Sequence, residues 1–293
     1  MKFLIPSIIS FSIFSSSIAQ NTESTQGSFT NEPVKSNVSV NSGVVLEDRI
    51  ENQSELEIEE DVRPFITDDS RVVGNRLGQL EAWMRIDKHE GQQWVMAAYG
   101  PSNWLEVSVG GVFGYEKSEQ ENTSFSYALP LVQGKFLFRE YASGKGPGFG
   151  AVVGSFFPGG KGAFKPEGFG TFAFATITQC FGENEDLLIH ANVGGNYLHI
   201  DQSGDLLGTW GVGSQVRVFK GMHLVGEIFS GDPYVPGAGI SYQVGYRYFF
   251  SDLLQIDMTV GEGMGGAQPL PFWFSAGVRI VTEKFLTPKR RNN

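Results

Sequence analysis

The sequence predicts an all-β protein: an antiparallel transmembrane β-barrel of about 12 strands with a disordered N-terminal leader. Three observations predict this fold. Apolar and polar residues alternate through most of the chain beyond residue 76, the connections between these stretches alternate in length, and the chain begins with a secretory signal. No run of residues approaches the roughly 18 apolar residues that a membrane-spanning helix needs.

The alternation is clearest in the stretch GTWGVGSQVRVF at residues 208–219, where Trp or Val is separated by Gly, Gln or Arg. A period of two gives an extended strand with two chemically different faces. No convincing helical period occurs in the rest of the chain. Similar alternation predicts twelve strands, at residues 77–87, 92–100, 103–115, 122–138, 147–157, 168–180, 186–200, 206–219, 221–230, 238–250, 253–261 and 271–284.

The connections between these strands favour a membrane barrel over a soluble sandwich. A membrane barrel has tight turns at its periplasmic end and longer loops at its outer end. Tight turns are expected at Pro101-Ser102, Phe181–Glu185, Lys220-Gly221 and Ser251-Asp252, and longer loops at 115–122, 157–167, 230–238 and 261–271.

The two faces of each expected strand differ in charge. The outward rows consist of every second residue, for example from Leu80 to Ile86 and from Phe272 to Ile280. They contain no charged residue, as expected where a mid-bilayer charge costs ~2–4 kcal/mol. Aromatic residues near the strand ends, including Phe219, Phe249 and Phe250, are expected to form girdles at the membrane surfaces. The opposite face collects the candidate lumen-lining residues: Glu81, Arg85, Glu106, Lys135, His190, Asn192, Gln215, Arg217, Glu227, Gln243, Arg247, Asp257 and Arg279.

The ends of the chain differ from this pattern. Residues 1–19 have the charged start, apolar middle and small-residue end of a signal peptide. Residues 20–62 hold ten acidic and two basic residues, a net charge of −8, and are too polar to offset their ordering entropy, which predicts an acidic disordered leader. Residues 63–76 are either a periplasmic lead-in or a short plug, in which Asp68, Asp69, Arg71 and Arg76 would pair with lumen charges. Residues 77–285 are the barrel, and residues 286–293 are a basic tail.

Two interpretations of the inward charges remain open. They either line a solute path of mixed charge or form a salt-bridged network that fills the lumen. About eight strands leave room only for side chains and about sixteen leave an aqueous channel, so twelve indicates a narrow or plugged pathway. An enzyme is not expected, because the four histidines have no metal-ligand spacing and no nucleophile relay is visible. No catalytic, cofactor or metal site is predicted, and the single Cys180 excludes an intramolecular disulfide framework.

The segment RPFITDDSRVVGNRLGQLEAWMR at residues 63–85 resembles the start of the meta-pathway phenol-degradation (MetA-type) family of outer-membrane transporter-like β-barrels. The shared positions are Arg63-Pro64, Asp68-Asp69, Gly74 and the run Gly78 to Glu81, and residues 97–116 resemble the second hairpin of that family. The resemblance implies a channel or transporter for small or hydrophobic compounds, including aromatic ones. It implies no binding residues.

The sequence therefore predicts a porin-like outer-membrane protein of a Gram-negative bacterium, exported by its signal peptide. The alternative is a structural or adhesive barrel with a closed lumen. The expected partners are outer-membrane lipid, a small or hydrophobic solute and the barrel-insertion machinery, and no nucleic acid is expected, since the folded part carries almost no net charge.

Overall fold

The computed structural model describes residues 66–117, 123–182, 185–200, 203–231, 239–266 and 269–282. The expected signal peptide, acidic leader and basic tail lie outside these residues. No helix among the described residues is long and apolar enough to cross a membrane. The strands are β1 (Gly78–Asp87), β2 (Glu90–Ser102), β3 (Leu105–Lys117), β4 (Thr123–Arg139), β5 (Gly148–Phe156), β6 (Gly160–Lys161), β7 (Phe169–Phe181), β8 (Leu187–Ile200), β9 (Ser203–Phe219), β10 (Met222–Ser230), β11 (Ile240–Ser251), β12 (Leu254–Gly265) and β13 (Trp273–Val281).

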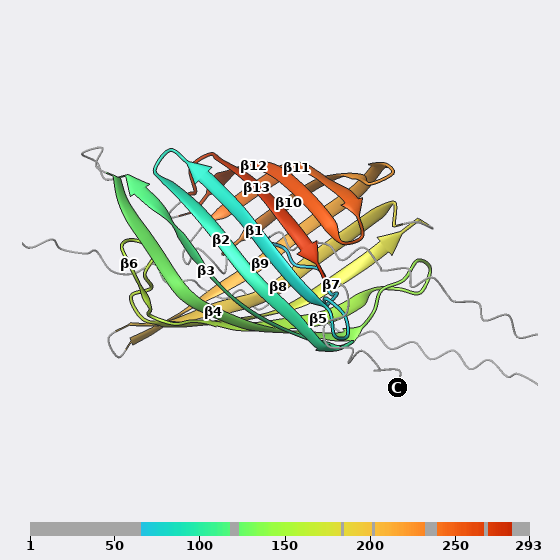
Figure 1. Ribbon diagram of the computed structural model, residues 1–293, viewed down its shortest axis with the longest axis horizontal. Helices are drawn as coiled ribbons and strands as arrows, with labels where there is room; N and C mark the ends of the chain where they lie inside the picture. Colours follow the sequence, from blue (N-terminus) through green and yellow to red (C-terminus); the bar gives the residue numbers. More distant parts are fainter. Residues whose placement is uncertain are drawn as a thin grey trace, which may run out of the picture. The chain divides into compact units, whose positions relative to one another are not determined.

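The twelve long strands close into one antiparallel barrel (Figure 1). Hydrogen-bonded neighbours follow the order β3-β2-β1-β13-β12-β11-β10-β9-β8-β7-β5-β4, and β4 pairs with β3 as well. The ring therefore has no free edge among its long strands, which removes the unpaired backbone groups that an open sheet exposes. This confirms the predicted fold class, and each of the twelve expected strands has its counterpart.

The short strand β6 was not expected. It lies in the connection between β5 and β7 and pairs with Tyr127 and Ala128 of β4. Because β5 spans only 9 residues against the 17 of β4, one end of β4 extends past its partner. β6 covers that exposed edge.

The connections divide the barrel into two ends. We call the end with the connections 103–104, 140–147, 182–186, 220–221 and 252–253 the turn end, and the other the loop end. The loop end carries the longer connections 157–168, 231–239 and 266–272, as predicted. Three connections depart from the expected alternation, since 88–89 and 201–202 are short at the loop end and 140–147 is long at the turn end.

The outer face of the barrel is apolar. Many residues of the predicted outward rows are exposed: Leu80, Ile86, Val107, Val109, Phe113, Trp210, Val212, Val216, Val218, Val244, Val260, Phe272 and Ile280. The prediction for the membrane girdle is wrong at one aromatic residue. Phe249 is buried, and its ring packs edge-on against the imidazole of His223. Phe249 therefore belongs to the inward face, one position out of phase with the exposed Phe250.

The interior is not uniformly polar, which corrects the expectation drawn from the inward charges. An apolar cluster occupies the inner wall of β2 to β7: Trp94, Met96, Val112, Ala128, Leu131, Val152 and Phe172. A register shift between β3 and β4 contributes to it, since Gly110 pairs with Leu131 but Val112 with Ala128. The bulge at Leu129 and Pro130 turns both Ala128 and Leu131 inward, although they differ in strand parity.

Candidate functional site

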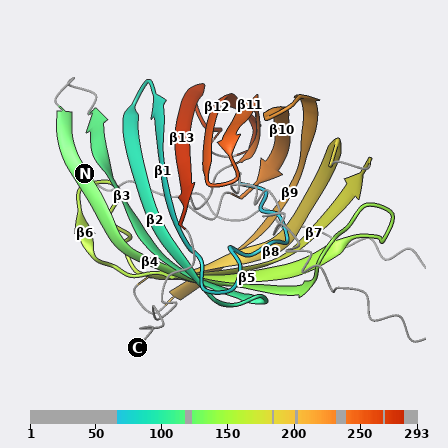
Figure 2. The same cartoon turned by 45° about the vertical axis from the view of Figure 1, so that its right-hand side comes forward.

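The chain segment before β1 lies inside the barrel (Figure 2). Residues 66–73 form hydrogen bonds with β3, β4, β7 and β10, which stand on different sides of the closed ring. A segment that reaches all these walls at once must cross the lumen. We call residues 66–73 the crossing segment.

Eleven of the thirteen candidate lumen residues are buried, and Asn192 and Arg217 are half-buried. Four groups emerge from their contacts: a lysine centre around Lys135, an amide and carboxylate centre around Glu227, a basic row on β9 to β11, and contacts to Arg85 and Arg279 near β1 and β13.

The lysine centre joins the crossing segment to the wall of β4. The Lys135 Nζ atom donates to Asp68 Oδ1 at 2.8 Å and to Asp69 Oδ1 at 3.0 Å. Lys135 also stands directly across from Glu106 of β3, whose carboxylate accepts the Val73 N–H at 2.9 Å. The buried ammonium thus faces three carboxylates, the arrangement that a buried charge requires.

The two aspartates of this centre differ in proton affinity. Burial raises the pKa of the Asp68 carboxyl to about 7, more than the nearby Lys135 lowers it. Burial acts in the same direction on Asp69, but the charges of Lys135, Arg71 and His190 together lower the pKa of Asp69 to about 2. Asp69 is therefore ionised throughout the neutral range, whereas Asp68 changes charge within it.

The second centre fixes the start of the crossing segment. The Glu227 carboxylate of β10 accepts the backbone N–H groups of Thr67 at 2.8 Å and of Ile66 at 3.2 Å. Gln243 of β11 donates to the same carboxylate and accepts from the Thr259 hydroxyl at 3.1 Å. These hydrogen bonds between the backbone and a buried carboxylate seat the segment on the wall of β10.

Two further contacts with the barrel wall hold the crossing segment. In the amide orientation that satisfies both of its polar atoms, Asn192 donates to the Asp68 carbonyl at 2.8 Å and accepts from the Asp68 N–H at 2.6 Å. The Thr178 hydroxyl accepts the Ser70 N–H at 3.0 Å and lies 3.1 Å from Nδ1 of His190. The crossing segment is therefore held by its backbone on β7 and β8 as well as on β10.

The basic row follows from strand register. Arg217 of β9 pairs with His223 of β10, and His223 pairs with Arg247 of β11, so three basic side chains stand in adjacent cross-strand positions. Gln215 accepts a hydrogen bond of 2.6 Å from Arg247 Nη1, and Asp257 of β12 stands across from Arg247. The row lies near the turn end, beside the connection 220–221.

The remaining candidates lie at the seam between the first and last strands. Arg279 donates to Gln79 Oε1 at 2.7 Å and stands across from Glu81. The Arg85 guanidinium lies 4.5 Å from the ring centroid of Trp273. Because β1 and β13 pair directly, these contacts join positions about 200 residues apart in sequence.

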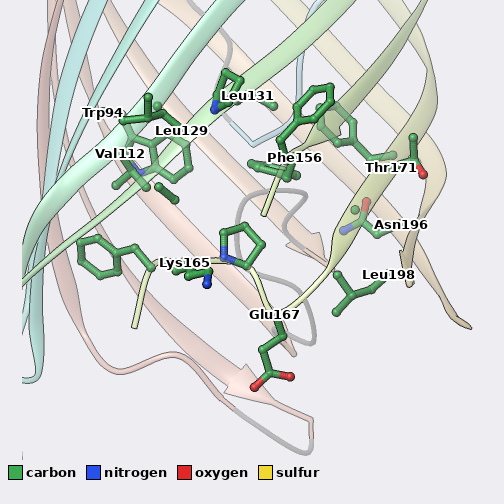
Figure 3. A pocket seen from close by; sticks show the side chains of 18 of the residues that line it. Trp94, Val112, Leu129, Leu131, Phe156, Lys165, Glu167, Thr171, Asn196 and Leu198 are labelled. Carbon is green, nitrogen blue, oxygen red and sulfur yellow. The ribbon is translucent and has the colours of Figure 1, made fainter. Parts of the chain in front are cut away.

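An apolar pocket of about 310 Å³ opens near the loop end (Figure 3). It lies against the apolar cluster and is bounded by the connection between β5 and β7 and by the ends of β7 and β8. Its walls include Trp94, Val112, Leu131, Phe156, Phe164 and Phe172. Sequence reasoning missed this pocket. Its inward aromatics Trp94, Phe156 and Phe172 lie on β2, β5 and β7, where no lumen residue was predicted, and its remaining wall is formed by a loop.

The pocket has few polar groups. Gln92 accepts from the Trp94 indole N–H at 2.9 Å and donates to Glu90, so these neighbouring polar groups already bond to one another. Lys165 lies on the loop side of the cavity, and Asn196 is on the β8 side (Figure 3). A concave apolar cavity with a few polar groups is typical of small-molecule sites.

No group of three or more His, Cys, Asp or Glu side chains within the described ranges could hold a metal ion. No protein-family model and no curated protein matches the chain. Solved structures do resemble it. The COG4313 outer membrane channel from Pseudomonas putida F1 is similar over 75% of this chain and 100% of that one, with 11% identity and a TM-score of 0.58. The likeness is one of fold.

Two porins are less similar. The KdgM porin has 9% identity and a TM-score of 0.49, over 70% of this chain and 99% of its own. The NanC porin has 10% identity and a TM-score of 0.47, over 71% of this chain and 100% of its own.

Proposed function

We propose that this protein is a channel for small solutes in the outer membrane of a Gram-negative bacterium. The observation that carries the proposal is an apolar pocket of about 310 Å³ inside a closed barrel whose outer face is apolar. An apolar exterior around a partly polar interior suits a protein surrounded by lipid. The barrel fold shared with the COG4313 channel is compatible with this function.

The pocket supports a hydrophobic solute, including an aromatic one. Trp94, Phe156 and Phe172 give it flat apolar walls, and stacked or edge-on ring contacts favour aromatic ligands beyond the burial of area. This agrees with what the resemblance of residues 63–116 to the MetA-type family implies. The lumen-lining candidates then form the polar path between the pocket and the turn end.

The crossing segment supports a plug rather than a simple lead-in. It spans the lumen beside the lysine centre, where the remaining cavity among Asp68, Glu106 and Lys135 is only about 30 Å³. A solute moving from the pocket to the turn end would therefore pass a constriction formed by this segment. The same observation favours the second candidate function, a structural or adhesive barrel whose lumen stays closed.

Conductance of the full-length protein in planar bilayers separates these two functions. We expect channels that 4-nitrophenol, added on the loop side, blocks transiently. Val112→Asn, which places a polar group in the pocket, is expected to raise the half-blocking concentration about tenfold because an unmatched polar group in an apolar site costs roughly 1–2 kcal/mol.

Val225→Asn is the matched control, since Val225 is equally buried on the inward face of β10 but does not line the pocket. The control is expected to leave the block unchanged. A protein that gives neither conductance nor solute uptake would support the closed structural barrel instead.

A further inference from the structure

The basic row on β9 to β11 places two arginines on either side of a buried histidine. Arg217, His223 and Arg247 occupy directly opposed cross-strand positions, where side chains approach to about 4.5–5.5 Å between Cβ atoms. The one carboxylate that the register places directly opposite the row is Asp257, across from Arg247. Glu227, four residues along β10 from His223, already accepts from Thr67, Ile66 and Gln243.

Donor groups in the row are left without acceptors. Among the described residues, neither ring nitrogen of His223 has a hydrogen-bond partner, although this side chain is only 1% exposed. Within the same ranges, Nε of Arg217 also has none. A buried polar atom without a partner costs free energy, so the N–H donors of Arg217 and His223 indicate a ligand that accepts hydrogen bonds.

Neighbouring side chains hold two members of the row in place. The hydrogen bond from Arg247 Nη1 to Gln215 Oε1 holds that guanidinium, and the ring of Phe249 lies 5.3 Å from the imidazole of His223 in an edge-on arrangement. Arg217 is half-buried, so part of its side chain is accessible to a small ligand. Planar guanidinium groups present paired N–H donors that match the two oxygens of a carboxylate.

From these observations we propose that Arg217, His223 and Arg247 form an oxyanion-binding site for the carboxylate of a small organic acid. The inference rests on the proposed channel function and adds that the solute carries a negative charge. The row lies on the turn side of the crossing segment, because Gly213, which contacts Thr67, is four residues along β9 from Arg217. A solute with an apolar ring and a carboxylate would meet the apolar pocket first and this row afterwards.

Binding of benzoate to the full-length protein in detergent, measured by isothermal titration calorimetry, tests the site without requiring conduction. We expect Arg217→Gln, which removes the charge and the paired N–H donors, and His223→Phe, which removes the ring donor, each to weaken benzoate binding about tenfold or more, the effect of losing a hydrogen bond to a charged group. Benzyl alcohol, which has the ring without the charge, is expected to bind equally to both variants and to the unaltered protein.

Lys220→Gln is the matched control, because Lys220 is an exposed cation in the adjoining turn and does not belong to the row. It should change benzoate binding less than twofold. Equal losses in Lys220→Gln and Arg217→Gln, or no loss in either row variant, would overturn the site. Heat-modifiable gel mobility confirms that each variant is folded. Absent conductance with intact benzoate binding would instead contradict the channel function alone.

Discussion

At the scale of single residues, strand parity predicted which side chains face inward but not which partners they find there. Glu106 and Lys135 were both predicted inward, and the register of β3 and β4 places them opposite each other. The aspartates that complete the lysine centre come from 66 and 67 residues away, in a segment with no periodicity of its own. The sequence predicted that these aspartates could pair with lumen charges if residues 63–76 form a plug, but only the closed sheet identifies Lys135 as their partner.

The two aspartates predict that the lumen changes charge near neutral pH. Because burial raises the pKa of Asp68 to about 7, its carboxyl is neutral at pH 5 and charged at pH 8. Lowering the pH therefore adds one net positive charge at the constriction, and we expect the reversal potential in a KCl gradient to shift toward anion selectivity with a midpoint near pH 7.

Asp68→Asn is expected to hold the selectivity at its low-pH value and to abolish this titration. Asp69→Asn provides the comparison, because Lys135, Arg71 and His190 lower the pKa of Asp69 to about 2 and leave it charged at both pH values. The Asp69 variant should therefore be more anion-selective but keep its pH dependence. A flat reversal potential from pH 5 to 8 in the unaltered protein would contradict the assignment to Asp68.

At the scale of elements, the twelve long strands could be predicted because each has an apolar outward face that alternates with an inward face. Their ends agree with expectation to within a few residues, except that β12 continues to Gly265. The bulge at Leu129-Pro130 and the strand β6 were not predicted. The bulge lies at a proline, which has no N–H for the ladder, and β6 pairs with the part of β4 that extends beyond β5. The glycines of β9 held information that the apolar and polar pattern did not contain, because they leave space on the inward face of the strand.

Those glycines make room for the crossing segment. A Cβ atom at Gly213 would lie 3.5 Å from the Cβ of Thr67, and one at Gly211 would lie 3.4 Å from it. The inward face of the stretch GTWGVGSQVRVF is therefore small at the level where Thr67 crosses and basic closer to the turn. Alternation predicted that this face points inward. Only the structure shows that the crossing segment packs against it.

This seat predicts a specific disulfide. Thr67→Cys combined with Gly213→Cys would place two Cβ atoms about 3.5 Å apart, within the range of about 3.5–4.5 Å found in disulfides. In a Cys180→Ala background, mild oxidation should remove both free thiols from this double variant, as measured by thiol alkylation and mass spectrometry. The crossing segment would then be tethered to β9.

The pair Thr67→Cys and Gly208→Cys is the control. Gly208 lies on the same strand, but a Cβ atom there would have no neighbour within 4 Å. We expect both thiols to remain free in this variant. If both pairs crosslinked to the same extent, or if neither did, the segment would not occupy the seat on β9.

At the scale of the whole molecule, the barrel is organised from outside inward: an apolar exterior, a wall without open edges among its long strands, and an interior divided into apolar and charged regions. The exterior could be predicted because the same apolar pattern repeats on the outward faces of the long strands. The division of the interior into apolar and charged regions could not be predicted from the sequence. It depends on which strands face each other across the lumen, and the β3–β4 bulge and the crossing segment alter that arrangement locally.

The apolar exterior makes a depth-dependent prediction, for which β9 offers a matched pair. Val212 and Val218 face outward on the same strand and are 50% and 52% exposed, but Val212 is central and Val218 is next to the turn 220–221. If lipid surrounds the barrel, Val212→Arg should lower the free energy of unfolding by ~2–4 kcal/mol and Val218→Arg by only ~0–1 kcal/mol. Urea titration of folding into phospholipid vesicles measures both values. Equal costs would mean that no hydrocarbon layer separates the two positions, because water or a protein partner would treat these equally exposed valines alike.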